Sequence, residues 1–176
     1  MKRIAGRDIS RHHVENNGDT PMTFQILALD ADDFAPLFTL DDAALAGQNA
    51  RRMTVDSEPG FPCRVSLEEG RVGETVLLLN HCSQDAESPY RASHAIFVRE
   101  GAPTAKPNPG DVPDVLSRRL LSVRGFDKDA MIQIADVIEG SKLAETLDAF
   151  FKNPTVDEIH IHNAMRGCYA AKARRA

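Results

Sequence analysis

Short stretches in which apolar and polar residues alternate predict that most of this chain is β-strand. The predicted strands are 24–29, 51–56, 63–68, 75–80, 92–99, 120–124, 131–138 and 156–162. Alternation is clearest in 63–68, where it places Cys63 on an apolar face and Arg64 on a polar face. A turn over 69–73 would join this strand to 75–80. That strand is apolar on both faces and is therefore expected at the centre of a sheet.

Helical patterns are fewer and shorter. The segment Thr39–Gly47 has a capping-box arrangement of Thr39 with Asp42 and ends in glycine, as short helices do. After Gly140 and Ser141, four large apolar residues recur at helical spacing and stop before Pro154: Leu143, Leu147, Phe150 and Phe151. The segment 169–175 is predicted as a short final helix.

Together these elements predict an α+β fold, because strands are many and strand–helix–strand units are few. We expect a single domain over 22–176, with a mostly antiparallel sheet of about seven or eight strands and two or three helices. One connection, from Ile138 to Val156 through the helix, predicts one parallel pairing. Residues 1–21 are polar and are expected to form a loosely ordered arm.

Composition narrows the classes of partner. The chain has 176 residues, 42% of them apolar, which is enough for a core without disulfides or metals. A formal net charge of −5 argues against nucleic acid, which requires a basic surface. No apolar run has the length of a membrane span or of a signal peptide. Three cysteines without a CxxC pair favour a reducing cytoplasm, and nothing indicates a homo-oligomer.

The segment His160–Cys168 holds the densest chemistry. In a strand, His160 and His162 project from the same face, which is one way in which metal sites are built. A third ligand would come from elsewhere, with Cys168, His94 or His81 as candidates. We favour the alternative, in which His160 is on a solvated face and His162 hydrogen-bonds to a neighbour. No cofactor can be named. Cys168 follows Gly167 and Arg166, and it is either a nucleophile near His162 or a packing residue.

Two further groups could line a pocket. His94 shares a strand face with apolar residues, so it is either a hydrogen-bonded core histidine or a pocket residue. Several arginines fall on polar faces of predicted strands: Arg64, Arg91, Arg99 and Arg124. If those faces converge, the arginines form a binding site for a carboxylate or phosphate; otherwise they pair with acids on an ordinary solvated sheet.

Five blocks of sequence, in this order, resemble the bacterial domain of unknown function DUF1203: Pro59–Arg64, Gly73–Asn80, Ser88–Val98, Leu121–Phe126 and His162–Cys168. The resemblance runs from about Phe24 to Arg175, and Gly125 stands where alanine is expected. It implies no activity, because the family is named for having none. The shared blocks contain the residues that the chemistry selects: Arg64, Tyr90, Arg91, His94, Arg124, His162, Asn163 and Cys168.

Two function classes follow. The first is a small enzyme or binding protein whose pocket holds an anionic small molecule. Its catalytic candidates are His162, Cys168 and His94, and its ligand-binding candidates are Arg64, Tyr90, Arg91, Arg124 and Asn163. The second class is a non-catalytic structural or interaction module. The pocket hypothesis requires Arg64, Arg124, His162 and Cys168 to converge on one cavity.

Overall fold

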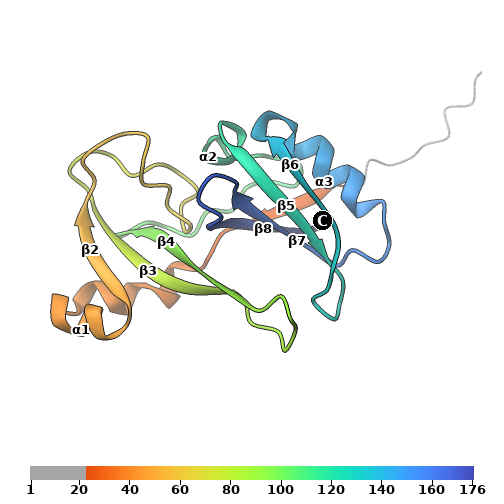
Figure 1. The fold of residues 1–176 in the computed structure, drawn as a ribbon. Helices are drawn as coiled ribbons and strands as arrows, with labels where there is room; N and C mark the ends of the chain where they lie inside the picture. The colour runs from red at the N-terminus through yellow and green to blue at the C-terminus, as the bar shows by residue number, and fades with distance from the viewer. Residues whose placement is uncertain (1–22) are drawn as a thin grey trace, which may run out of the picture.

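The computed structural model describes residues 23–176, so the predicted polar arm lies outside the described residues. Eight strands form two antiparallel sheets that lie side by side (Figure 1). The five-stranded sheet has the order β1 (Phe24–Leu27), β8 (Tyr169–Arg175), β7 (Glu158–Asn163), β5 (Leu120–Phe126) and β6 (Ile132–Glu139). The three-stranded sheet has the order β2 (Ala50–Thr54), β3 (Thr75–Gln84) and β4 (Ala92–Arg99). The α+β prediction is therefore confirmed, with the strands divided between two sheets.

The helices are short and lie on the outside of the sheets (Figure 1). The α-helices are α1 (Asp42–Gly47), α2 (Asp114–Ser117) and α3 (Leu143–Phe151). Three short 3-10 helices are η1 (Ala31–Asp33), η2 (Ala35–Thr39) and η3 (Gly140–Lys142). No helix among residues 23–176 is long and apolar enough to cross a membrane.

The main core lies between the five-stranded sheet and α3. Ile159 and Ile161 of β7 face α3, which buries Leu143, Leu147, Phe150 and Phe151, the stripe that the sequence predicted. Each such side chain contributes about 1.5–3 kcal/mol when fully buried. A second core packs one face of the three-stranded sheet against the segments around it. These two cores fix the sheets in place, and most of the candidate residues lie where the sheets meet.

The predicted strand over 63–68 is wrong. Residues 61–67 are nearly all buried and form a compact turn, closed by bonds from the Leu67 amide to the Cys63 carbonyl (3.1 Å) and from the Cys63 amide to the Glu68 carbonyl (2.8 Å). Leu67 adopts a left-handed φ of 52°, which no strand contains. The predicted hairpin is absent as well, because β3 pairs with β2 across the long connection 55–74. As predicted, β3 is the central strand of its sheet.

Three other local predictions need correction. Residues 169–175 form strand β8, because hydrogen bonds to β1 and β7 on both sides outweigh the helical propensity of its alanines. No parallel pairing joins β6 to β7, since β5 lies between them. Helix α1 is capped by Asp41, whose carboxylate accepts the Ala44 amide, and not by Thr39.

At the start of η3, the backbone around Gly140 is packed so closely that no side chain fits there. An added Cβ would lie 2.1 Å from the Leu116 carbonyl oxygen and 2.7 Å from that of Arg119. We expect Gly140→Ala to lower the free energy of unfolding by about 1–3 kcal/mol, because the backbone must shift. Gly47→Ala is the matched control: nothing lies within 4 Å of its added Cβ, so stability should hold or rise. Urea denaturation measures both, and equal stability of the two variants would contradict this packing.

Candidate functional site

Arg64 lies in the buried turn and is itself only 2% exposed. Its Nε donates to the Tyr169 carbonyl (2.8 Å), its Nη1 to the Pro62 carbonyl, and its Nη2 to Cys168 Sγ (3.1 Å). Burial lowers the pKa of this guanidinium, although arginine remains protonated in proteins. The 55–74 connection is thereby joined to the start of β8, so Arg64 links segments about a hundred residues apart.

The turn between β7 and β8 aims Cys168 at Arg64. Gly167 adopts a left-handed φ of 69°, and its amide donates to the Asn163 carbonyl (2.8 Å). The Asn163 amide donates in turn to the Cys168 carbonyl (3.0 Å), and Asn163 Nδ2 lies 3.4 Å from the sulfur. Cys168 Sγ therefore accepts from two side-chain donors, a guanidinium and an amide. Such donors stabilise negative charge on sulfur.

A cavity of about 720 Å³ opens above this cluster. We call it the arginine cavity, because its walls carry Arg64, Arg118, Arg119 and Arg166. His94, Asn163 and Cys168 also line it, together with apolar side chains. None of its sixteen lining residues, as far as residues 23–176 show, is an aspartate or glutamate. Charge at its surface is therefore of one sign.

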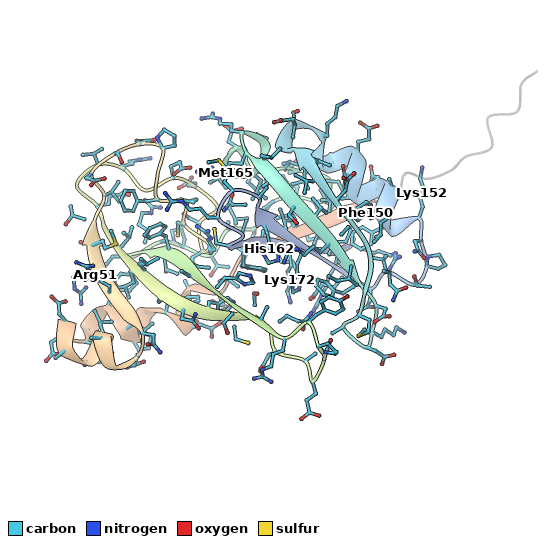
Figure 2. The ribbon with its side chains drawn as sticks, viewed as in Figure 1. Arg51, Phe150, Lys152, His162, Met165 and Lys172 are labelled. Atoms are coloured by element: carbon cyan, nitrogen blue, oxygen red, sulfur yellow. The ribbon has the colours of Figure 1, made fainter. Side chains whose placement is uncertain are left out.

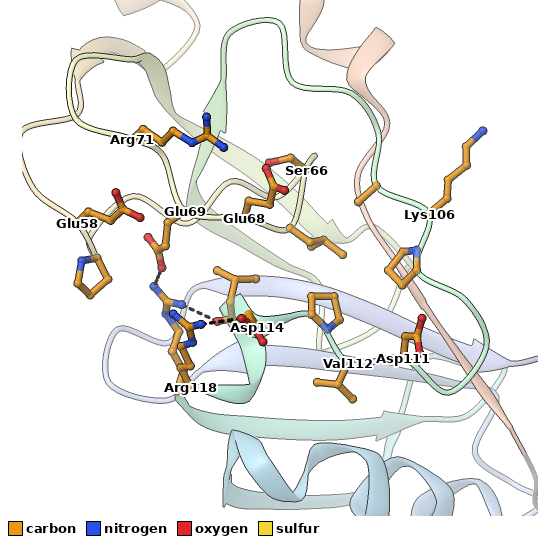
Figure 3. A pocket seen from close by; sticks show the side chains of 17 residues that line it. Glu58, Ser66, Glu68, Glu69, Arg71, Lys106, Asp111, Val112, Asp114 and Arg118 are labelled. Carbon is orange, nitrogen blue, oxygen red and sulfur yellow. Dashed lines mark hydrogen bonds and ion pairs between the residues drawn. The ribbon is translucent and has the colours of Figure 1, made fainter.

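A larger cavity, of about 1190 Å³, lies on the other side of Arg118 and Arg119 (Figure 3). It contains none of the residues selected from the sequence. Its walls mix both signs of charge: Arg118 pairs with Asp114 (2.6 Å) and Arg119 with Glu69 (Figure 3). Carboxylates line this larger cavity, and none of the candidate residues does, so we take the smaller arginine cavity as the candidate site.

Histidines occupy the space between the two sheets, where His162 is labelled in Figure 2. His81 and His94 pair across β3 and β4, while His160 and His162 project from the same face of β7. The rings of His94 and His162 are 4.8 Å apart. His160 is held by Glu158 (2.8 Å) and is 1% exposed, which corrects the prediction that it is solvated.

We call His81, His94, His160 and His162 the histidine layer. Burial lowers the pKa of three of these four imidazoles. It is the main reason why the pKa of His162 falls to about 3, and the positive charge of Arg124 lowers it further. Burial also lowers the pKa of His94 and of His81. His162 Nδ1 donates to the Gly167 carbonyl (3.1 Å), as expected of a neutral ring. The imidazoles of His81, His94 and His162 are thus uncharged packing groups at neutral pH.

The family comparison agrees with the sequence blocks. A family model described as a protein of unknown function, DUF1203, matches residues 60–175, which is most of the chain. This chain belongs to the DUF1203 family. The match begins at Gly60, later than the resemblance to Phe24 that we expected. No curated protein and no solved structure matches the chain.

In this DUF1203 chain, the predicted site residues divide into two groups. Arg64, His94, Asn163 and Cys168 meet at the arginine cavity. The requirement that Arg124 and His162 also reach it is not met, because neither residue lines the cavity. His162 is buried between the sheets, and Arg124 Nε donates to Ser122 Oγ (3.2 Å).

The remaining two candidates lie away from the cavity. Tyr90 stacks edge-on against Phe126 at the far end of the histidine layer. Arg91 is exposed and pairs with Asp85 in the β3–β4 turn, so it takes no part in a shared site.

Sequence reasoning missed Arg118 and Arg119. They follow α2 in a segment without a motif, and only the fold brings them beside Arg64. The metal hypothesis finds no geometric support among residues 23–176, where no group of three or more His, Cys, Asp or Glu side chains could hold an ion. His160 is hydrogen-bonded to Glu158, and the sulfur of Cys168 accepts hydrogen bonds from Arg64 and Asn163.

The neutral histidines make stability depend on pH. A folded-state pKa below the ordinary 6.5 means that the folded state binds fewer protons than the unfolded state. The stability that the neutral His162 contributes is therefore fully present above about pH 6.5, and it is lost as the pH falls towards 3. We expect His162→Asn to lose less stability between pH 7 and 5 than the natural chain, by up to about 1.4 kcal/mol per pH unit.

Urea denaturation at several pH values measures this difference. Glu158 does not interfere: burial alone would raise its pKa, but hydrogen bonds from His160, Lys172 and Arg174 lower it to about 2, below the tested range. Parallel pH profiles for the variant and the natural chain would contradict a neutral, buried His162.

Proposed function

We propose that this DUF1203 protein binds a small organic anion in the arginine cavity. One observation carries the proposal: four arginines and no carboxylate line a cavity between five separate segments of the fold. Guanidinium groups bind carboxylates and phosphates through paired hydrogen bonds, so the cavity is complementary to those groups.

The four arginines are not equally available. Arg64 is occupied by two carbonyls and the sulfur, and Arg119 by Glu69. The Arg118 pair with Asp114 is highly exposed on both sides and can exchange its partner at little cost. Arg166 is exposed and enters none of the ion pairs found within 23–176. Arg166 and Arg118 are therefore the groups that would hold the ligand.

Size and apolar surface define the rest of the ligand. A volume of about 720 Å³ is within the range of small-molecule sites, roughly 300–1,000 Å³. Met165 is 92% exposed and Leu120 42% exposed, and both line the cavity. An anion with an apolar portion would cover these side chains, whereas an inorganic ion would leave them in water.

Binding, as proposed here, does not require a reaction. Within residues 23–176, no imidazole lies in hydrogen-bond distance of Cys168 Sγ, so the sulfur lacks an adjacent general base. We further propose a bacterial, cytoplasmic setting, which suits three cysteines that are all free thiols. The interaction-module alternative differs in that it predicts no stabilisation by small anions.

A thermal-shift panel tests the proposal. It would contain aryl and alkyl carboxylates and phosphomonoesters, with phenyl phosphate and benzoate as first probes. We expect these anions to raise the melting temperature, because a ligand that binds the native state stabilises it. Benzamide, which lacks the charge, should not. In Arg166→Gln the affinity should fall about fivefold, since an exposed charge-assisted contact contributes about 1 kcal/mol.

Arg51→Gln is the control, since it removes the same charge from an exposed position on β2, far from Met165 in Figure 2. Its response to the anions should equal that of the natural chain. The proposal is refuted if no anion of the panel stabilises the protein, or if Arg166→Gln and Arg51→Gln respond alike.

A further inference from the structure

Arg64 carries a positive charge that no carboxylate balances. Arg64 is only 2% exposed, and its hydrogen-bond acceptors are two backbone carbonyls and one sulfur. None of the ion pairs formed by residues 23–176 includes it. A buried charge is normally paired, because an isolated one is costly to desolvate. A negative charge beside Arg64 would offset this cost beyond what the two carbonyls supply.

Cys168 is the ionisable group that accepts a hydrogen bond from this guanidinium. Cys63 lies nearby and its sulfur accepts the backbone amides of Ser66 and Arg99, but no hydrogen bond joins that sulfur to the guanidinium of Arg64. Tyr169 offers only its carbonyl to Arg64, and its phenol is held neutral, since burial raises the pKa well above the ordinary value. The counter-charge therefore falls on the sulfur of Cys168.

We propose that Cys168 is a thiolate that balances Arg64, and that it exchanges with small disulfides bearing carboxylates, which the arginine cavity admits. The thiolate attacks one sulfur of the disulfide, and a new S–S bond forms to Cys168. The original S–S bond breaks, and the other half leaves as a thiolate with the electron pair, to be protonated by water. The product is a mixed disulfide, and a second thiol reverses the step.

The choice of reactant rests on the proposed function, because the same cations that would bind an organic anion would bind the carboxylates of the disulfide. Arg166 and Arg118 lie at the cavity walls with the sulfur. The cavity is also large enough for a molecule of tripeptide size. The thiolate itself rests on Arg64 and does not depend on that ligand.

The other two cysteines provide internal controls. Cys63 is buried and does not line the arginine cavity. Cys82 is partly exposed, and its thiol donates to the Gln84 carbonyl (3.5 Å) and towards the Asp85 carboxylate (3.7 Å). Cys82 is therefore partly exposed and lies beside a carboxylate, whereas Cys168 lies beside a guanidinium.

The experiment exposes the full, reduced chain at neutral pH to glutathione disulfide, which is anionic, or to bis(2-hydroxyethyl) disulfide, which is neutral. Mass spectrometry of peptides then locates and times each adduct. We expect Cys168 to react at least about tenfold faster than Cys82. Arg166→Gln should slow the reaction with the anionic disulfide about fivefold and leave the neutral one unchanged, while Arg51→Gln changes neither.

Two results would overturn the inference. If Cys168 reacts no faster than Cys82 with either reagent, it is not the reactive thiolate. If it reacts quickly but Arg166→Gln slows neither reagent, carboxylate-bearing disulfides are not its preferred class. Either result can be distinguished from a failure of anion binding, because the Cys168→Ser variant cannot react with a disulfide but keeps the four arginines of the cavity. Stabilisation of that variant by phenyl phosphate or benzoate would show that anion binding survives alone.

Discussion

The buried guanidinium of Arg64 is the constraint on which the rest of the site depends. It fixes the turn after Pro62, the first residue of β8 and the sulfur of Cys168 through three sets of N–H donors. Because arginine cannot discharge by losing its proton, the surrounding structure must supply both acceptors and compensating charge. The turn between β7 and β8 is shaped to do so, with Gly167 in the left-handed region and Asn163 beside the sulfur.

The space between the two sheets contains one region of uncharged imidazoles and one region of positive charge. Between β4 and β7 the imidazoles are packed against one another and kept neutral by burial, with Arg124 nearby. The arginine cavity, by contrast, is open, and the charged side chains that line it are all arginines. The histidines that attract attention in the sequence therefore belong mainly to the packing of the two sheets. His94 is the exception, since it also lines the cavity while its Nδ1 contacts Ser83 Oγ (2.8 Å).

The sequence predicted what local periodicity determines. The strand Ala92–Arg99, the α3 stripe and the common face of His160 and His162 are all as expected. It failed where tertiary burial overrides the local pattern: Arg64 alternates like an exposed strand residue yet is only 2% exposed, and the alanines of β8 favour a helix in isolation. Arg118 and Arg119 reach the cavity through long-range packing, which no single-sequence pattern encodes.

The central claim is that Cys168 carries the charge that balances Arg64. The most direct measurement is the ultraviolet absorbance of the thiolate at neutral pH, compared between the natural chain and Cys168→Ser. A difference equal to one thiolate per chain is the predicted result, and Cys82→Ser should show no such difference. Identical thiolate absorbance in the natural chain and in Cys168→Ser would contradict the account, because Arg64 would then be buried without a counter-charge.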